Sequence, residues 1–415
     1  MNPFKEFTVG SKIKFSNWQS MSSKPYDKNA VSPYTKTRVI LMNGTEFEAN
    51  WFLHNFNRHC SNNDIRRAIA MVRRQEQQQQ KRIASLKPIN ESILETTIAY
   101  EQLAVDLTAE MAQKEPNPFV KEQLDFALLE DFDHLYRYAN LLEMEENKHA
   151  ETLVGKYTEI TPARPTIAEH RHPYDDVRFY INSYQDSLIT RLHTMIITAA
   201  EQQTMNYYMN VANLYHSPLG RKLYSEIAMI EEQHVTGYGS LIDPNCTWLE
   251  SWVMHEYTEC YLYYSCYMDE SDSYIKSIWL KHYEEELTHL QIATETLLKY
   301  EGKSFEQLFR CGADFPDLLK LKSNKNYIRE VIKTVRNTGY REMVVALKDL
   351  PNDANFFKYQ KQVNSSPEKV ASHVVIDKFI DKYGTDYRYE DSPNPEKTLQ
   401  NRSKDNMDLG RIKNA

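Results

Sequence analysis

The 415-residue chain has few glycines, no long apolar run and no secretory leader pattern. Its 11 glycines are few for an architecture of strands and tight turns, so the composition favours a mainly helical protein. No apolar run approaches the ~20 residues of a membrane-spanning helix. The opening MNPFKEFTVG has no apolar core after its charges. We therefore expect no membrane association and a cytoplasmic location.

A basic excess and paired cysteines are also missing. Fifty Lys and Arg residues against 58 Asp and Glu residues give a net charge of -8, which provides no general attraction for nucleic acid. The five cysteines form neither a C-x-x-C pair nor a zinc-ribbon spacing, and their odd number fits a reducing compartment. The 28 tyrosines are explained by aromatic packing, with a redox role beside a metal as the alternative.

Long helical patterns separated by short turns dominate residues 89–302. Three of the turns carry residues that begin helices: Asn117 and Ser217 each precede a proline, and Asp272 precedes an apolar-periodic run. Each of these turns marks the bend of a helical hairpin. We predict hairpins over residues 90–153, 174–241 and 246–301.

The three hairpins repeat one spacing of acids and histidines. In each, one acid lies 16 residues before the N-cap residue, a second acid lies 14 residues after it, and a histidine follows three residues later. The three sets are Glu101, Asp131 and His134; Glu201, Glu231 and His234; and Glu256, Glu286 and His289. Because a helix rises 1.5 Å per residue, two arms of roughly 15 residues bring both acids and the histidine to one height in the hairpin. The repeat predicts equivalent supersecondary units.

These acids and histidines interrupt apolar helix faces. The i, i+4, i+7 line through Leu94 and Ile98, for example, continues through Glu101. A buried carboxylate is costly unless a charge compensates it, and no Lys or Arg recurs on the same faces. Two helices with one Glu each and two helices with Glu-x-x-His form the ligand set of dinuclear iron and manganese bundles. We predict two bound iron ions, with manganese or a mixed pair as alternatives.

The segments AAEQQTMNYY and IAMIEEQHVTGYGSLI, and likewise HEYTECYLYY and HYEEELTHLQIATETLLKYEG, resemble the paired half-repeats of the ferritin-like superfamily, above all of rubrerythrin-type proteins. The resemblance covers about residues 90–302. It implies an all-α fold, a ferritin-like helical bundle with an additional hairpin and with helical N- and C-terminal extensions. The chain departs from the pattern in having Asp131 where the family has Glu, and in having a third hairpin. Glu259, one turn after Glu256, resembles the additional glutamate of some rubrerythrin-like sites.

A long crossover decides which hairpins we pair. Ferritin-like bundles have one long connection between their hairpins, and VGKYTEITPARPTIAEHRHP, which contains three prolines, follows the first hairpin. We therefore pair the first hairpin with the second. The predicted metal ligands are Glu101, Asp131, His134, Glu201, Glu231 and His234. Pairing the first hairpin with the third satisfies the same topology, and it leaves an alternative set of ligands, Glu256, Glu259, Glu286 and His289. In the crossover itself, we assign His170 and His172 to capping and solubility, with a role beside the metals as the alternative.

The flanking regions carry no recognisable catalytic constellation. Residues 1–88 include the basic, glutamine-rich stretch DIRRAIAMVRRQEQQQQKRIASL and predict an N-terminal arm or an outer helix with a solvated face. Residues 303–389 predict a C-terminal helical extension that caps the bundle or mediates assembly. Residues 390–415 are polar, have no apolar face and predict a disordered tail.

These features predict a dimetal, carboxylate-bridged oxidoreductase that acts on peroxide or dioxygen. Because the chain lacks rubredoxin-type cysteines, it would need an external electron donor. The alternatives are a ferroxidase or iron-handling protein, a di-iron oxidase or hydroxylase with an organic substrate, and a helical scaffold without metal. An apolar pocket beside the metals would favour the organic substrate. Catalytic residues other than the ligands are not assigned, and the sequence leaves homo-oligomerisation open.

Overall fold

The computed structural model describes residues 1–155, 157–164, 166–334 and 336–388. In this part the chain is mainly α-helical, and its one small sheet pairs β1 (Asn337–Tyr340) with β2 (Met343–Ala346) in antiparallel register. The predicted all-α fold class is confirmed. The tail predicted over residues 390–415 lies outside the described residues.

The chain forms two compact units, and each unit is assembled from separate stretches of sequence. Unit 1 comprises Met1–Asn90, Tyr180–Ala200 and Ile242–Leu321. Unit 2 comprises Glu91–Phe179, Glu201–Leu241 and the chain from Lys322 onward. The helix α7 (Leu188–Leu214) belongs to unit 1 as far as residue 200 and to unit 2 from residue 201. This division differs from the predicted arm (1–88), three-hairpin bundle (89–302) and extension (303–389), because the hairpins pair across the sequence rather than in order.

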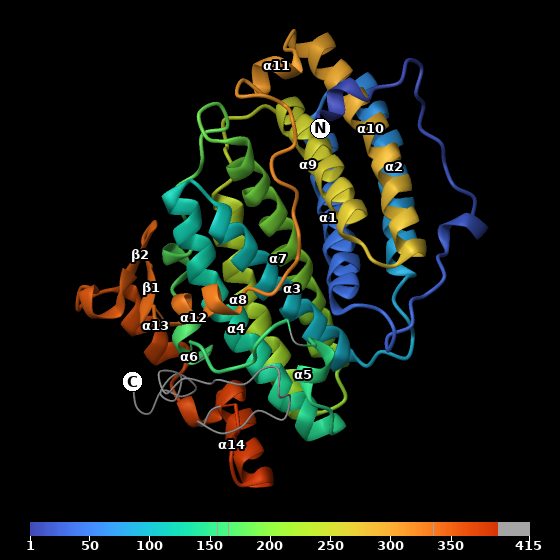
Figure 1. Ribbon diagram of the computed structural model, residues 1–415. Helices are drawn as coiled ribbons and strands as arrows, with labels where there is room; N and C mark the ends of the chain where they lie inside the picture. The colour runs from blue at the N-terminus through green and yellow to red at the C-terminus, as the bar shows by residue number, and fades with distance from the viewer. Residues whose placement is uncertain (156, 165, 335, 389–415) are drawn as a thin grey trace. The chain divides into compact units, whose positions relative to one another are not determined.

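Unit 1 is built mainly from two helical hairpins. Its long helices are α1 (Pro33–His59), α2 (Asn63–Ala84), α9 (Trp248–Asp269) and α10 (Ser273–Glu301). Helix α1 packs against α2 and α9, and α10 packs against α9 and α2, so the four run side by side (Figure 1). Its short helices are η1 (Pro3–Lys5), η2 (Gln19–Met21) and α11 (Phe305–Leu308). Asn62 caps α2 and Asp272 caps α10, each by accepting backbone N–H hydrogen bonds, so the helix start predicted at Asp272 is confirmed.

The N-terminal segment forms α1 and α2, and α2 has both a solvated face and a buried one. In α2 the buried residues recur every three or four positions, which is the line of one helix face. This line contains Ile65, Ile69, Val72, Glu76, Gln79 and Ile83. Because two of its members are polar, the composition of the stretch hides a face that belongs to the core of unit 1.

Unit 2 contains the other two hairpins. Its long helices are α3 (Ile93–Lys114), α4 (Pro118–Glu146), the second part of α7 and α8 (Pro218–Ser240). Asn117 and Ser217 cap α4 and α8, and each precedes a proline in the first helical turn, as predicted. The long crossover predicted between α4 and α7 is present. It contains the short helices α5 (Ala150–Leu153), α6 (Thr166–Glu169) and η3 (Pro173–Asp175).

The C-terminal extension predicted over residues 303–389 is divided between the units at residue 321. The part in unit 2 carries the small sheet and several short helices. These helices are α12 (Lys325–Ile332), η4 (Leu347–Asp349), α13 (Asn355–Val363), η5 (Pro367–Lys369) and α14 (Ala371–Tyr383). Helix α14 packs against α4 and α8, and α12 packs against α3 and α4. The extension therefore covers the outer faces of the unit 2 helices.

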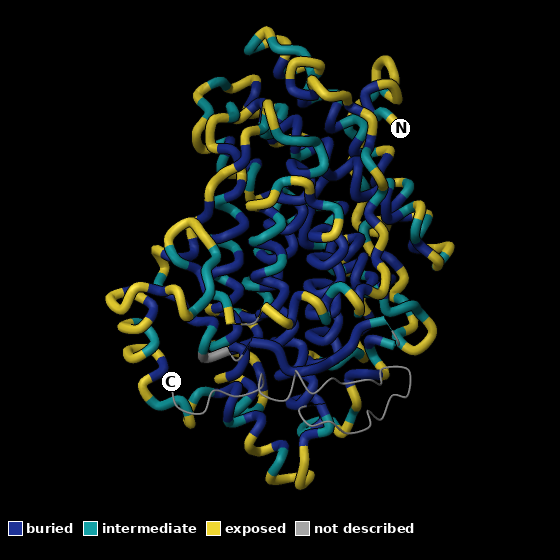
Figure 2. Tube along the Cα trace, turned by 60° about the vertical axis from the view of Figure 1, so that its left-hand side comes forward, coloured by how far each residue is buried: buried dark blue, intermediate teal, exposed yellow. Residues whose placement is uncertain are grey.

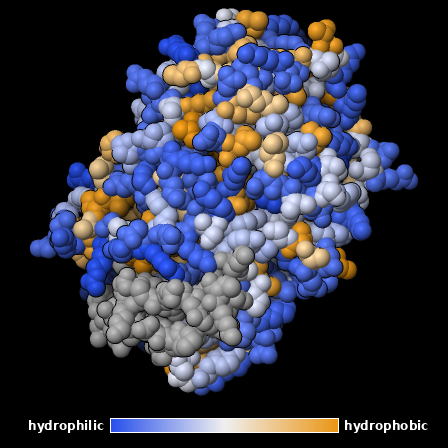
Figure 3. Space-filling model, in the orientation of Figure 1, coloured by the Kyte–Doolittle hydropathy of each residue, from blue (hydrophilic) through white to orange (hydrophobic). Residues whose placement is uncertain are grey.

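Burial follows the helix faces, with buried residues on their inner sides and exposed residues gathered in loops and on outer sides (Figure 2). On the face drawn in Figure 3, hydrophilic side chains predominate and apolar ones form small groups between them. None of the described helices is both long and apolar enough to cross a membrane. The inner helix faces also bury polar and charged residues, and this burial needs a functional explanation.

Candidate metal centre

The six ligands predicted from the first two hairpins meet inside unit 2, and each is at most 1% exposed. We call them the unit 2 cluster: Glu101 on α3, Asp131 and His134 on α4, Glu201 on α7, and Glu231 and His234 on α8. The ligand atoms of Asp131, Glu201, Glu231 and His234 all lie within 4.8 Å of one another, and so do those of Glu101, His134 and Glu231. Because Glu231 belongs to both groups, the cluster offers two adjacent cation positions with a shared carboxylate.

The imidazole of His234 is held between the cluster and an outer carboxylate. Its Nδ1 lies 3.2 Å from Asp131 Oδ1, 3.2 Å from Glu231 Oε2 and 3.8 Å from Glu201 Oε2. Its Nε2 lies 2.8 Å from Glu130 Oε2. A histidine that donates its other N–H to a carboxylate in this way has its tautomer and orientation set for binding a metal.

His134 has the same arrangement at the other position. Its Nδ1 lies 3.0 Å from Glu231 Oε1, and its Nε2 lies 3.3 Å from Glu169 Oε2. Glu169, at the end of α6, is fully buried. Both histidines thus turn Nδ1 toward the cluster and Nε2 toward an outer carboxylate.

Two arginines from the crossover hold the outer carboxylate of Glu130. Arg164 Nη1 donates to Glu130 Oε1 at 2.7 Å, and Arg171 Nη1 donates to the same oxygen. Burial alone would raise the pKa of Glu130, but Arg171, the hydrogen bond with His234 and Arg164 hold that pKa well below its ordinary value. Glu130 is therefore a fixed negative charge behind His234.

The cluster itself has more negative charge than its protein partners neutralise. Asp131 and Glu201 have no well-aligned hydrogen bond on either carboxylate oxygen, and Glu101 Oε2 has none. Burial raises the pKa of all three acids. Burial also favours the neutral form of Glu231, but His134 and then His234 outweigh this effect and lower the pKa of Glu231 to about 2. Unpaired buried carboxylates fit cations, and a bound cation would replace the protons that these groups otherwise share.

The departure noted at Asp131 is visible in the geometry. Asp131 joins Glu201, Glu231 and His234 but is not a member of the group formed by Glu101, His134 and Glu231. An aspartate is one methylene shorter than a glutamate and reaches less far across the cluster. The two positions therefore have unequal sets of donors.

The alternative ligands of the third hairpin do not join the unit 2 cluster. Glu256, Glu259, Glu286 and His289 lie in unit 1, where they meet Glu46 of α1 and Glu76 of α2. We call these six residues the unit 1 cluster. The ligand atoms of Glu76, Glu256 and His289 lie within 4.8 Å of one another, and so do those of Glu256, Glu259 and Glu286.

Sequence reasoning missed a fourth copy of the repeat. Counting from the N-cap residue Asn62, Glu46 lies 16 residues before it, Glu76 lies 14 residues after it and Gln79 follows three residues later. The spacing is the same as in the other hairpins, with a glutamine in place of the histidine. The spacing to Asn62 was therefore a usable signal, whereas no spacing marked Glu169, Arg164 or Arg171 as partners of the unit 2 cluster.

Of the two crossover histidines, only His172 is placed as the preferred interpretation predicted, whereas His170 is buried and so does not serve loop solubility. The side chain of His172 accepts a hydrogen bond from Tyr174 N and caps η3. His170 is buried, but it does not belong to the groups of ligand atoms described above. Comparisons with protein families, with curated proteins and with solved structures found no match to this chain.

Proposed function

We propose that the unit 2 cluster binds two metal ions, iron or manganese, and that the protein is a dimetal-carboxylate oxidoreductase acting on peroxide or dioxygen. The observation that carries the proposal is the pair of overlapping ligand groups that share Glu231. Two histidines with their outer nitrogens held by carboxylates support it, because a scaffold would have no use for this orientation. When bound, two such ions supply two electrons to a single O–O bond.

The chain contributes a hydrogen-bond donor at the edge of the cluster. Tyr208 Oη donates a hydrogen bond to Glu101 Oε1, and both side chains are fully buried. Burial raises the pKa of Tyr208 well above its ordinary value, so the phenol keeps its proton near neutral pH. The hydrogen bond orients Glu101, whose other carboxylate oxygen, Oε2, accepts no hydrogen bond and can face a cation.

A row of aromatic rings supports reduction by an external donor. Tyr207 is half-buried, its ring stacks on Tyr100 with centroids 4.4 Å apart, and it lies 5.7 Å from the ring of Tyr208. The ring of Tyr208 lies in turn 5.2 Å from that of Tyr138. These contacts connect the accessible Tyr207 with Glu101 and fit electron delivery from a partner.

Metal analysis of the full-length protein tests the proposal. The protein is loaded anaerobically with ferrous iron, desalted and analysed for metal, alongside Glu231→Ala and the neighbouring control Glu232→Ala. Glu232 is partly exposed and outside the cluster. We expect Glu231→Ala to hold about two fewer ions per chain than the wild type and Glu232→Ala to hold the same number.

Stopped-flow absorption after addition of peroxide to the iron-loaded proteins completes the test. Oxidation in the wild type and in Glu232→Ala, but not in Glu231→Ala, supports the peroxide reaction. Oxidation by dioxygen alone, followed by release of ferric iron, would favour the ferroxidase alternative. Equal metal contents in wild type and Glu231→Ala would overturn the proposal and leave the scaffold.

A further inference from the structure

The unit 1 cluster repeats the frame of the unit 2 cluster residue by residue. In each unit, the later hairpin in the sequence (α9–α10 in unit 1, α7–α8 in unit 2) supplies a glutamate and then a Glu-x-x-His pair. The earlier hairpin (α1–α2 in unit 1, α3–α4 in unit 2) supplies a glutamate and a further acid. Equivalent positions are Glu46 and Glu101, Glu76 and Asp131, Gln79 and His134, Glu256 and Glu201, Glu286 and Glu231, and His289 and His234. All members of the unit 1 set are at most 1% exposed. The two sets of residues are therefore alike in burial as well as in spacing.

The surroundings of the unit 1 histidine are also equivalent. His289 Nδ1 lies 2.9 Å from Glu286 Oε2 and 3.7 Å from Glu256 Oε2, while its Nε2 lies 3.1 Å from Gln75 Oε1. Gln75 directly precedes Glu76, just as Glu130 directly precedes Asp131. The residue before the acid thus orients the histidine of the opposite hairpin in both units, with Nδ1 directed at the carboxylates.

Each cluster also has a tyrosine that donates a hydrogen bond to one of its glutamates. Tyr263 Oη donates to Glu46 Oε1, as Tyr208 donates to Glu101. Each tyrosine lies seven residues after the acid of its own helix, Glu256 for Tyr263 and Glu201 for Tyr208. A frame with this many matching contacts fits the same purpose, which is to hold acids and a histidine around a cation.

Several carboxylate oxygens of the unit 1 cluster have no hydrogen-bond partner in the protein. Glu76 and Glu259 have no hydrogen bond on either oxygen, and Glu46 and Glu256 each leave one oxygen without one. Within the described chain, no Lys or Arg side chain forms an ion pair with these four acids or with Glu286. Five acids and one histidine without a balancing charge need cations or protons.

The donor set of unit 1 differs from that of unit 2 in being richer in oxygen. Gln79 replaces a histidine, and its Nε2 donates to Glu286 Oε1 at 2.5 Å, so the amide nitrogen faces the cluster as a donor and offers no lone pair. Glu259 adds a carboxylate that unit 2 lacks, since the equivalent residue there is Thr204. Carboxylate-rich sites suit hard cations such as Mn²⁺ better than sites with more imidazole.

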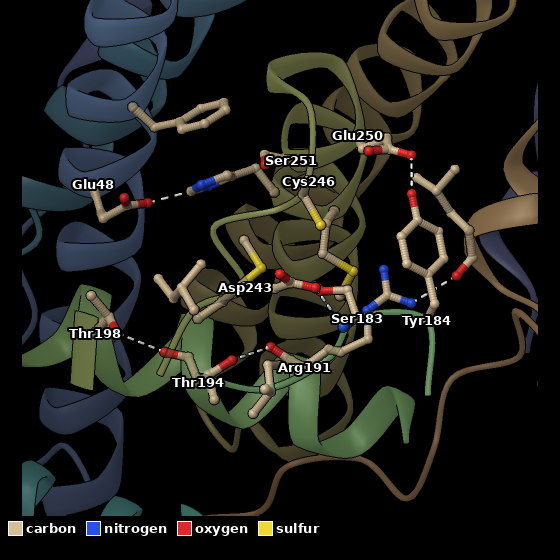
Figure 4. A pocket seen from close by; sticks show the side chains of 17 residues that line it. Glu48, Ser183, Tyr184, Arg191, Thr194, Thr198, Asp243, Cys246, Glu250 and Ser251 are labelled. Carbon is tan, nitrogen blue, oxygen red and sulfur yellow. Dashed lines mark hydrogen bonds and ion pairs between the residues drawn. The ribbon is translucent and has the colours of Figure 1, made fainter. Parts of the chain in front are cut away.

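Two cavities of unit 1 lie near this cluster. A cavity of about 160 Å³ has a mainly apolar lining that includes Phe52, Met195 and Met254, and Figure 4 shows polar residues at its rim, with Tyr184 directed at Glu250. A second void of about 10 Å³ is lined by Glu259 of the cluster. Glu48, Met195 and His255 line both spaces. The smaller void has about the volume of a single water probe, so it fits the passage of an ion or a water molecule.

We propose that unit 1 holds a second metal site, independent of the unit 2 cluster, in which Glu76, Glu256, Glu286 and His289, with Glu46 and Glu259, bind at least one hard divalent cation of the Mn²⁺ type. In this proposal the cation enters by way of the small void beside Glu259, which shares Glu48, Met195 and His255 with the larger pocket. Gln75 is a positioning residue for His289.

The test measures Mn²⁺ binding in a full-length variant whose unit 2 cluster is disabled by Glu231→Ala and His234→Ala. The metal-free protein is titrated with manganese chloride, and free Mn²⁺ is followed by its electron paramagnetic resonance signal. We expect saturable binding of at least one ion per chain. Adding Glu256→Gln and Glu286→Gln, which keep the size of the side chains, should abolish it.

Two single changes in the same background sharpen the result. His289→Ala should raise the Kd for Mn²⁺ by roughly tenfold or more. The control Glu284→Gln changes an exposed acid of the same helix and should leave the Kd unchanged. Absence of Mn²⁺ binding in the disabled background, or binding that survives Glu256→Gln with Glu286→Gln, would overturn the proposal without affecting the result for unit 2.

Discussion

The clusters of the two units share a frame but differ in their donors. In both, a histidine turns Nδ1 toward carboxylates and is held at Nε2 by the residue that precedes an acid of the opposite hairpin. The donors differ where His134 is matched by Gln79, and where Glu259 is added in unit 1. The shared frame therefore sets the orientation of the donor atoms, whereas single positions on it set which cation the donor atoms suit.

The support behind the histidine differs as well. In unit 2 it is the carboxylate of Glu130, held by Arg164 and Arg171. In unit 1 it is the neutral amide of Gln75, whose Nε2 donates to Lys14 O at 3.3 Å. A carboxylate partner makes an imidazole a stronger electron donor than an amide partner does. If both clusters bind metal as proposed, the imidazole of unit 2 would be the stronger electron donor to a redox metal and that of unit 1 the weaker one.

The largest expected effect comes from removing the negative charge of Glu130, which supports His234 in unit 2. In the metal-free protein, Glu130→Gln should lower the free energy of unfolding by roughly 3 kcal/mol, because it leaves buried arginines without their shared carboxylate. Gln75→Ala should cost less, about 2 kcal/mol, the value of the two neutral hydrogen bonds that it removes. Urea titrations of both variants measure the difference. Equal losses in the free energy of unfolding would show that the two supports contribute equally to stability, and would contradict the difference inferred between the units.

Exchanging the donors at the equivalent positions should exchange part of the metal preference. His134→Gln should weaken ferrous iron binding in unit 2 by roughly 100-fold at the position formed with Glu101, because a ligand nitrogen is lost. Gln79→His, made in the Glu231→Ala and His234→Ala background, should add ferrous iron binding to unit 1. Equilibrium dialysis with ferrous iron under anaerobic conditions measures both. Unchanged iron binding in both variants would mean that these positions do not contact metal.

The tyrosines offer a smaller and more specific contrast. Tyr208→Phe removes one hydrogen bond to an acid and should cost about 1 kcal/mol of stability in the metal-free protein. Tyr263→Phe also removes the hydrogen bond with His282 Nδ1 and should cost about 2 kcal/mol. Only Tyr208→Phe should slow the oxidation of the iron-loaded protein by peroxide, since Tyr208 belongs to the row of rings that reaches Glu101 in unit 2. Thermal unfolding and stopped-flow absorption separate the two effects. A slowed reaction in Tyr263→Phe would place the redox chemistry in unit 1.

The sequence was sufficient for the unit 2 cluster because three local signals agree there: helix caps at Asn117 and Ser217, equal spacings to the acids, and a crossover with three prolines. It was insufficient for unit 1. Asn62 is not followed by proline, and Gln79 replaces the histidine that marks the other copies. The α1–α2 hairpin pairs with the α9–α10 hairpin through contacts between residues about 200 positions apart in the sequence, and no local pattern records such contacts.

The partners from the crossover could not be predicted for a different reason. Arg164 lies in an irregular stretch and Glu169 ends the four-residue helix α6, so no extended helical period relates them to the histidine or acid that they contact. Their position depends on the path of the chain over α4 rather than on spacing. Charged residues in a proline-rich loop are ordinarily solvated, and only their burial distinguishes these two.

The smallest expected effect concerns the rate of metal uptake in unit 1. Met195 lines both the pocket and the void beside Glu259, so Met195→Trp should narrow the passage between them. Mn²⁺ binding to unit 1 should then slow by several-fold while its Kd stays the same, because the change lies outside the ligand set. Ferrous iron binding to unit 2 should keep its rate. Rapid-mixing measurements of free Mn²⁺ in the Glu231→Ala and His234→Ala background test the rate in unit 1, and stopped-flow measurements of ferrous iron binding in the chain with an intact unit 2 cluster test the rate there. The conservative change Met195→Leu at the same position is the control. An unchanged rate in Met195→Trp would mean that the cation enters by another route, and the pocket would then have to be explained by an organic ligand rather than by the passage of metal.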